Sequence, residues 1–122
     1  MPGDEADNQD IWCIYWDRSA DEISLKIYDD SGNSWSETSI ATGMADDSAG
    51  SYAQMSAAPR HSDNHAILAA WSAPNVATAD LRVWDIGGVS DITAMTNVVT
   101  DLDESGAVAV FVDQRDNSIY VV

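Results

Sequence analysis

The chain alternates between short apolar runs and short polar turns, and no segment has the apolar period of a helix. Three runs are almost continuously apolar and each is followed by a short polar residue. They are residues 11–16, 66–71 and 107–112. A continuous apolar run of this length predicts a strand that is buried on both faces.

Each apolar run is followed by a polar turn and then by a segment in which apolar and polar residues alternate. These second segments are residues 23–29, 81–85 and 119–122. Alternation such as Ile23, Leu25 and Ile27 predicts a strand with one more exposed face. The turns are rich in Asp, Asn, Ser and Pro, which favour tight connections between antiparallel strands. The pattern therefore predicts an all-β, antiparallel fold.

The hairpins repeat along the chain. Trp16, Trp71 and Val112 occupy equivalent positions about 40–55 residues apart, which is the spacing of β-propeller blades with four short strands each. Weaker patterns predict the remaining strands at residues 37–41, 52–58, 92–96 and 98–102. We therefore predict about three antiparallel propeller blades, the terminal ones incomplete.

The predicted organisation is a flexible acidic N-terminus at residues 1–9, followed by a propeller segment over residues 10–122. The blade units are residues 10–42, 52–97 and 98–122. The first unit begins at a second strand and the third stops at a third strand, which leaves open strand edges. We expect other copies of the chain, two of which give about six blades, or a neighbouring structural chain, to complete the arrangement.

The charge balance is strongly acidic, with 21 Asp and Glu against 5 Lys and Arg and a net charge of −16. Such a surface repels phosphate backbones, so we expect no nucleic-acid partner. The acids either bind cations or a basic partner, or form a solvated surface that suits a halophilic source. We predict no cofactor; calcium at Asp29 and Asp30 or at residues 101–104 stays an alternative, without EF-hand spacing.

The apolar runs are far shorter than a membrane span, so we expect no membrane insertion. The first seven residues are acidic and polar, unlike a secretory leader. Cys13 is the only cysteine, which excludes an intrachain disulfide, and its apolar surroundings predict a small buried side chain.

A polar segment at residues 28–35 separates two predicted strands of the first unit. Asp30, Gly32, Ser34 and Trp35 match the Ser/Thr-x-Asp-x-Gly-x-Thr-Trp pattern, whereas Tyr28 departs from it. The segment resembles the Asp-box of sialidase-like β-propellers. In such a box we expect Asp30 to cap the turn, Gly32 to take a positive φ and Trp35 to pack under the hairpin.

The second unit keeps only the Asp-x-Gly core of the box, at residues 85–87. Residues 60–71 resemble repeats of the tail and fibre proteins of tailed viruses. These resemblances imply a propeller fold on an extracellular or virion surface, with a cytoplasmic location left open. The box is a folding element in that family, so it implies no activity.

A sialidase would need three converging arginines, a Tyr–Glu nucleophile pair and an acid/base Asp, but the four arginines of this chain are scattered. We therefore predict a non-enzymatic binding or scaffold module, glycan-binding or adhesive. A fragment or relative of a sialidase-like glycoside hydrolase and a purely structural assembly component remain alternatives.

Five residues are candidates for ligand binding: Tyr28, Trp84, Arg82, His61 and His65. Tyr28 and Trp84 lie on alternating strands, where we expect exposed rings that stack on sugars. His61 and His65 have a spacing that permits a metal site. They lack the helix that would align both rings, so a polar turn is the favoured interpretation.

Overall fold

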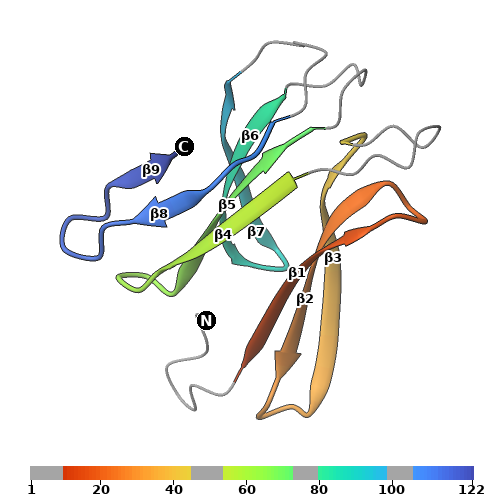
Figure 1. Ribbon diagram of the computed structural model, residues 1–122. Helices are drawn as coiled ribbons and strands as arrows, with labels where there is room; N and C mark the ends of the chain where they lie inside the picture. The colour runs from red at the N-terminus through yellow and green to blue at the C-terminus, as the bar shows by residue number, and fades with distance from the viewer. Residues whose placement is uncertain (1–9, 45–53, 73–79, 99–105) are drawn as a thin grey trace.

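The computed structural model describes residues 10–44, 54–72, 80–98 and 106–122, and within these residues every regular element is a β-strand (Figure 1). The nine strands are β1 Ile11–Asp17, β2 Glu22–Asp29, β3 Ser34–Thr42, β4 Gln54–Arg60, β5 His65–Trp71, β6 Leu81–Gly88, β7 Asp91–Val98, β8 Val110–Val112 and β9 Ile119–Val121. None of the described residues forms a helix that is long and apolar enough to span a membrane.

The strands of the described residues form three antiparallel sheets, and within each sheet the strands that follow one another in the chain are paired. The first sheet has the order β1-β2-β3, the second β4-β5-β6-β7, and the third β8-β9. The prediction of an all-β, antiparallel fold is therefore confirmed. Strand addition along the chain is the arrangement that short polar turns allow, because a hairpin needs only a few connecting residues.

Four turns use a residue with positive φ just before the next strand. These residues are Asp21, Asn33, Asn64 and Asn117, with φ between 44° and 62°. Asn and Asp tolerate this left-handed conformation better than other non-glycine residues. The carboxylate of Asp17 reinforces the first of these turns, because it accepts a hydrogen bond from Ser19 N at 2.8 Å. Asx residues therefore both bend and cap the turns.

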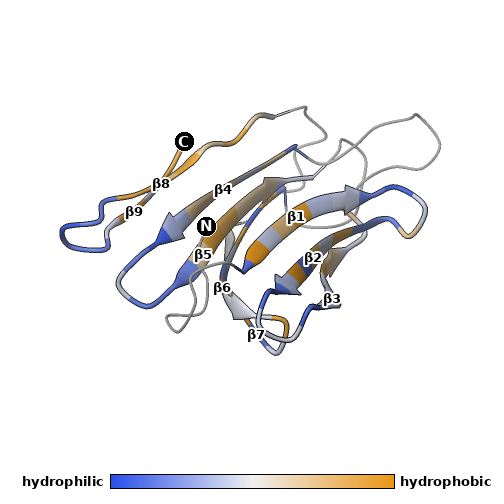
Figure 2. Cartoon of the chain, turned by 90° about the horizontal axis from the view of Figure 1, so that it is seen from below, coloured by the Kyte–Doolittle hydropathy of each residue, from blue (hydrophilic) through white to orange (hydrophobic). Residues whose placement is uncertain are grey.

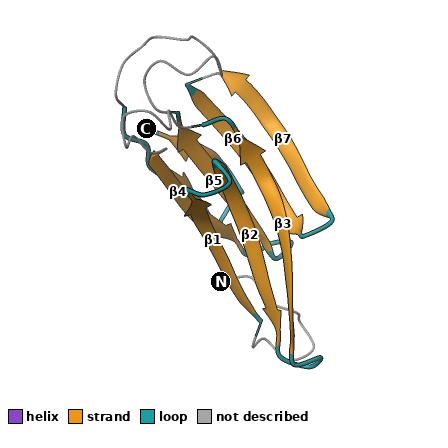
Figure 3. Cartoon of the chain, turned by 90° about the vertical axis from the view of Figure 1, so that its right-hand side faces the viewer, coloured by secondary structure: helices purple, strands orange, loops and turns teal. Residues whose placement is uncertain are grey.

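One face of the first sheet packs against the second sheet. Trp12, Ile23 and Leu25 come from the first sheet, and Leu68 and Trp84 come from the second. Alternate residues of β2 share this face since Trp12 pairs with Ile27 and Trp16 with Ile23. Figure 2 colours much of β5 and parts of β1 as apolar. The strands of the two sheets run in nearly the same direction in Figure 3.

The opposite face of the second sheet packs against the third sheet. Ile67, Ala69 and Val83 meet Val110 there, and the partly buried Val121 covers the edge of the cluster. Strand β5 therefore lies between two apolar layers. Its residues 66–70 are all buried, so the predicted burial on both faces is confirmed for this strand.

The same prediction is wrong for the other two apolar runs. Cys13 is exposed and so is Ile11, because among the described residues only one face of the first sheet packs against another sheet. In the third run the strand covers only Val110–Val112, and Phe111 is exposed on the uncovered side. An apolar run indicates a strand but cannot say how many sheets pack against it.

Two predicted segments fall on residues that the structure describes only in part or not at all. The strand predicted at residues 98–102 is described only at Val98, which is the last residue of β7. The N-terminal residues 1–9 lie outside the described chain.

Candidate functional site

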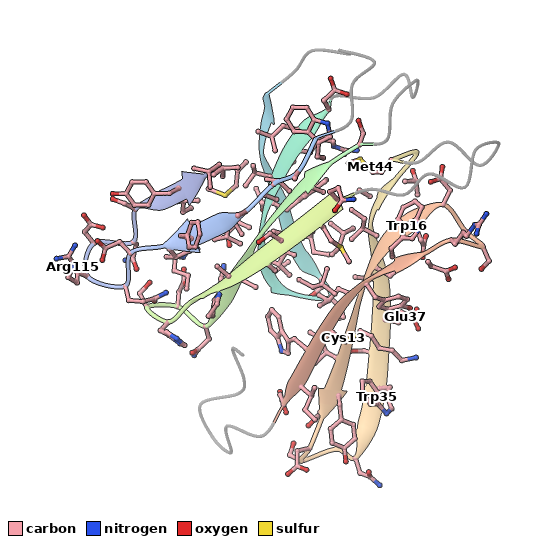
Figure 4. The ribbon with its side chains drawn as sticks, in the orientation of Figure 1. Cys13, Trp16, Trp35, Glu37, Met44 and Arg115 are labelled. Carbon is pink, nitrogen blue, oxygen red and sulfur yellow. The ribbon has the colours of Figure 1, made fainter. Side chains whose placement is uncertain are left out.

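The face of the first sheet that points away from the second sheet carries aromatic and charged side chains. We call it the aromatic face; its members are Cys13, Tyr15, Lys26, Tyr28, Trp35 and Glu37. The strand register brings them together, because Cys13 pairs with Lys26, Lys26 with Glu37, and Tyr28 with Trp35. Figure 4 labels Cys13, Glu37 and Trp35 along this sheet.

Trp35 is the most prominent side chain of the aromatic face, and 56% of its surface is exposed. Its ring centroid lies 5.1 Å from that of Tyr28, with a tilt of 46° between the planes. The Lys26 ammonium lies 5.6 Å from the Trp35 ring centroid on the same face. These contacts hold the indole in place while much of its surface remains open to solvent.

Glu37 connects the two polar side chains of the aromatic face. Its Oε2 lies 3.4 Å from Lys26 Nζ, and its Oε1 accepts a hydrogen bond from the hydroxyl of Tyr15. The hydrogen bond from Tyr15 and the contact with Lys26 lower the pKa of Glu37. The same hydrogen bond raises the pKa of Tyr15 to about 12, since a phenolate beside a carboxylate is unfavourable. At neutral pH the carboxylate is ionised and the phenol is protonated.

The turn below Trp35 differs from the expected Asp-box in which residue caps it. Asp29, and not Asp30, accepts hydrogen bonds from Gly32 N at 2.9 Å and from Ser31 Oγ at 2.8 Å. These hydrogen bonds lower the pKa of Asp29. The backbone amide of Asp30 donates instead to Asp10 at 3.1 Å. The expected cap at Asp30 is therefore wrong, because the carboxylate of Asp29 caps the turn instead.

The other expected features of the box are also different. Asn33 takes the positive φ of 44° that was expected at Gly32. Gly32 is needed for space, because a Cβ there would lie 2.5 Å from Asp29 Oδ2. Ser34 begins β3 and is exposed, and Trp35 lies on the open aromatic face instead of packing under the hairpin.

A second polar cluster joins the β4–β5 turn to β6. The guanidinium of Arg60 contacts Asp63 Oδ2 at 2.6 Å and Asp85 Oδ2 at 2.7 Å. Nδ1 of His65 lies 2.7 Å from Asp85 Oδ1. The two carboxylates raise the pKa of Arg60, and Arg60 lowers the pKa of Asp63. Of this cluster, only His65 was predicted as a candidate. Arg60, Asp63 and Asp85 were not predicted, although their positions beside turns indicate that their side chains can meet.

The Asp-x-Gly remnant of the second unit belongs to this cluster. A Cβ at Gly87 would lie 2.8 Å from His65 Nε2 and 2.6 Å from Asp91 Oδ2. Gly87 therefore leaves room for the His65 ring beside Asp91. The side chains of the cluster bond to one another and tie three strands together, which is a structural role.

The remaining candidates lie elsewhere in the fold. Trp84 is buried between the first two sheets, so the expectation that it is exposed is wrong. The guanidinium carbon of Arg82 lies 4.8 Å from the Trp84 ring centroid, and its Nη1 donates to Met44 Sδ at 3.5 Å. His61 is exposed in the β4–β5 turn, where its backbone amide donates to Gln114 of the third sheet. The five candidates do not form one site, and only Tyr28 lies on the aromatic face.

Within the described residues, no group of three or more His, Cys, Asp or Glu is arranged to hold a metal ion. The acidic residues at 101–104 lie outside the described chain. Among known proteins, no family model, no curated protein and no solved structure matches this chain.

Proposed function

We propose that the chain is a non-enzymatic binding module of propeller-type blades, and that its aromatic face binds a glycan. The three sheets support the blade interpretation, because the first two are antiparallel meanders of three and four strands, the third is a hairpin, and they are stacked in chain order. Serial stacking of four-stranded meanders is how propeller blades build a common core. A second copy or a neighbouring structural chain would complete the ring at the faces left open.

The observation that carries the glycan proposal is the exposed indole of Trp35, held beside Tyr28 on one face of the first sheet. Large aromatic rings are usually buried, and an exposed ring fixed by neighbours is a typical ligand contact. Charged and hydroxyl groups at Lys26, Glu37 and Tyr15 surround it. A sugar ring presents a C–H face to such an indole and hydroxyls to the polar groups.

The proposal is tested on a broad glycan array with the wild type and with Trp35→Ala. We expect the wild type to bind at least one glycan class and the variant to lose most of that signal. Tyr120→Ala is the matched control, because Tyr120 is an aromatic residue of similar exposure, 55% against 56%, on the third sheet. Equal loss in both variants, or binding that survives Trp35→Ala, would contradict the assignment of the site.

The third sheet favours a second function, that of a structural assembly component on a virion or another extracellular surface. Phe111, Tyr120 and Val122 are exposed by 58%, 55% and 74%. Phe111 pairs with Tyr120, so both rings point away from the second sheet. An apolar face of this kind is typical of an interface. Light scattering at high salt, where the acidic copies repel less, tests it; a monomer under those conditions would exclude self-assembly.

The Tyr15–Glu37 pair is the local feature that bears on the glycoside-hydrolase alternative. A nucleophilic tyrosine needs a lowered pKa or a base that takes its proton. Here Glu37 accepts the hydrogen bond of Tyr15 and is the base that such a pair would need, although it also raises the pKa of Tyr15 to about 12. Turnover of fluorogenic glycosides by the purified chain, abolished by Tyr15→Phe, would support the hydrolase instead.

A further inference from the structure

We propose that Glu37 makes the aromatic face selective for neutral glycans, by neutralising the ammonium group beside the Trp35 ring. This inference rests on the proposed glycan-binding function and names the chemical class of the ligand.

Lys26 is the cation that an acidic sugar would need on this face. It is the only lysine in the sequence, and its ammonium lies 5.6 Å from the Trp35 ring centroid. An ammonium at this distance from a stacking surface could pair with the carboxylate or sulfate of a sugar on the ring. The structure gives it a partner already, because Glu37 Oε2 lies 3.4 Å away.

The carboxylate of Glu37 stays charged under all ordinary conditions. Tyr15 donates a hydrogen bond to it and Lys26 lies beside it, and both lower the pKa of Glu37. The pKa of Asp29 in the adjoining turn is lowered as well, by the Gly32 amide and the Ser31 hydroxyl. The charged side chains of the aromatic face itself are therefore Lys26 and Glu37, which lie side by side.

A negatively charged sugar meets unfavourable potential on this face, and the net charge of −16 adds to it. At physiological ionic strength charges within about 8 Å still act on one another, so the effect is local and not fully screened. A neutral sugar avoids this repulsion. Its hydroxyls can donate to Glu37 and accept from Lys26, while its ring covers the indole of Trp35.

The test uses calorimetric titration of the full chain with uncharged cellohexaose and mannohexaose, and with anionic hexagalacturonate and 3′-sialyllactose. We expect binding of a neutral oligosaccharide and none of the anionic probes by the wild type. Trp35→Ala should weaken the neutral interaction about tenfold. Glu37→Gln keeps an acceptor for Tyr15 but removes the negative charge. It should make binding of the anionic probes detectable, and tighter at low salt.

Thermal melting of each variant shows that it remains folded. Wild-type binding of an anionic probe that is lost in Trp35→Ala would overturn the charge selectivity and leave the proposed function standing. The selectivity also fails if Glu37→Gln leaves the discrimination between neutral and anionic probes unchanged. Absence of binding to all four probes and to the glycan array would overturn the proposed function together with this inference.

Discussion

Strands β5 and β1 begin from the same kind of sequence and end in different environments. Both are apolar runs followed by a short polar residue and occupy equivalent positions in the sequence repeat, although β1 lies at the edge of its sheet and β5 lies between β4 and β6. Residues 66–70 of β5 are buried on both faces, whereas Ile11 and Cys13 of β1 are exposed. Sheets cover both sides of the second sheet, and only one side of the first.

The difference shows that the burial of a strand depends on how many other sheets pack against its own sheet. On the side that is covered only in β5, Ile67 and Ala69 pack against the third sheet, whereas the corresponding side of β1 carries Cys13 and Tyr15. In the first sheet the uncovered side is therefore available for polar and aromatic contacts. The proposed ligand site and the buried core thus arise from opposite faces of equivalent strands.

The largest effect that tests this comparison is expected from Leu68→Ala in β5. Leu68 is fully buried between the first two sheets, so the substitution removes apolar contacts and leaves a cavity. We expect it to lower the free energy of unfolding by about 3 kcal/mol. The matched change Ile11→Ala in β1 should cost less than about 1 kcal/mol. Urea denaturation measures both; equal costs would contradict the one-sided burial of the first sheet.

A smaller difference in the free energy of unfolding is expected between two Arg–Asp ion pairs, one partly buried and one exposed. Arg60 and Arg115 each bind a neighbouring Asp through two nitrogens, but their side chains are 13% and 89% exposed. We expect Arg60→Gln to cost about 2 kcal/mol, because Asp85 loses a partly buried partner. Arg115→Gln should cost less than about 0.5 kcal/mol. Urea midpoints measured at low salt and at 0.5 M salt compare the two.

The Arg60 effect should also depend on pH. Arg60 lowers the pKa of Asp63 in the folded state, so this stabilisation is present above the unfolded pKa of about 4. It is lost as the pH falls through the lower, folded value. The stability difference between the wild type and Arg60→Gln should therefore shrink below about pH 4. A difference that stays constant from pH 6 to pH 2.5 would show that the ion pair does not carry it.

A further change tests how the third sheet is attached to the second. Gly106 passes so close to Trp71 that a Cβ would overlap the indole ring. Gly106→Ala should therefore displace the segment before β8 and cost about 1 kcal/mol in the free energy of unfolding. Ala107→Ser, at the exposed neighbour, is the control and should have almost no effect. Proteolysis after Val112 should also become faster in Gly106→Ala only.

The smallest effect is expected on the uncovered side of the first sheet, and only in alkali. Glu37 raises the pKa of Tyr15 in the folded state to about 12 from an unfolded value near 10. The stabilisation is complete below the unfolded value and is lost as the pH rises through the folded one. Tyr15→Phe should therefore remove a slow decline in stability above pH 10. Absorbance at 295 nm should show one phenol that ionises late in the wild type and is missing in the variant.

The Asp-box shows how far the sequence could locate a local feature. Matching the pattern placed a tight polar turn between β2 and β3, and this turn is present. The roles within it moved by one position, because Asp29 caps the turn and Asn33 takes the positive φ. Several neighbouring Asp and Asn residues can each cap a turn or take a positive φ, and the backbone geometry of the turn decides which residue does so. The exposure of Trp35 depended in turn on which side of the sheet remained open.

The sequence by itself determined the strands, the antiparallel hairpins and the polar turns, because these depend on local periodicity and on residues that favour tight turns. Only the tertiary structure decided which faces are covered. It buried Trp84 and exposed Cys13, and it gathered Arg60, Asp63, His65 and Asp85 from three strands. Contacts between sheets join residues far apart in the chain, so no local pattern records them. Tyr28 and Trp35 face solvent together for the same reason.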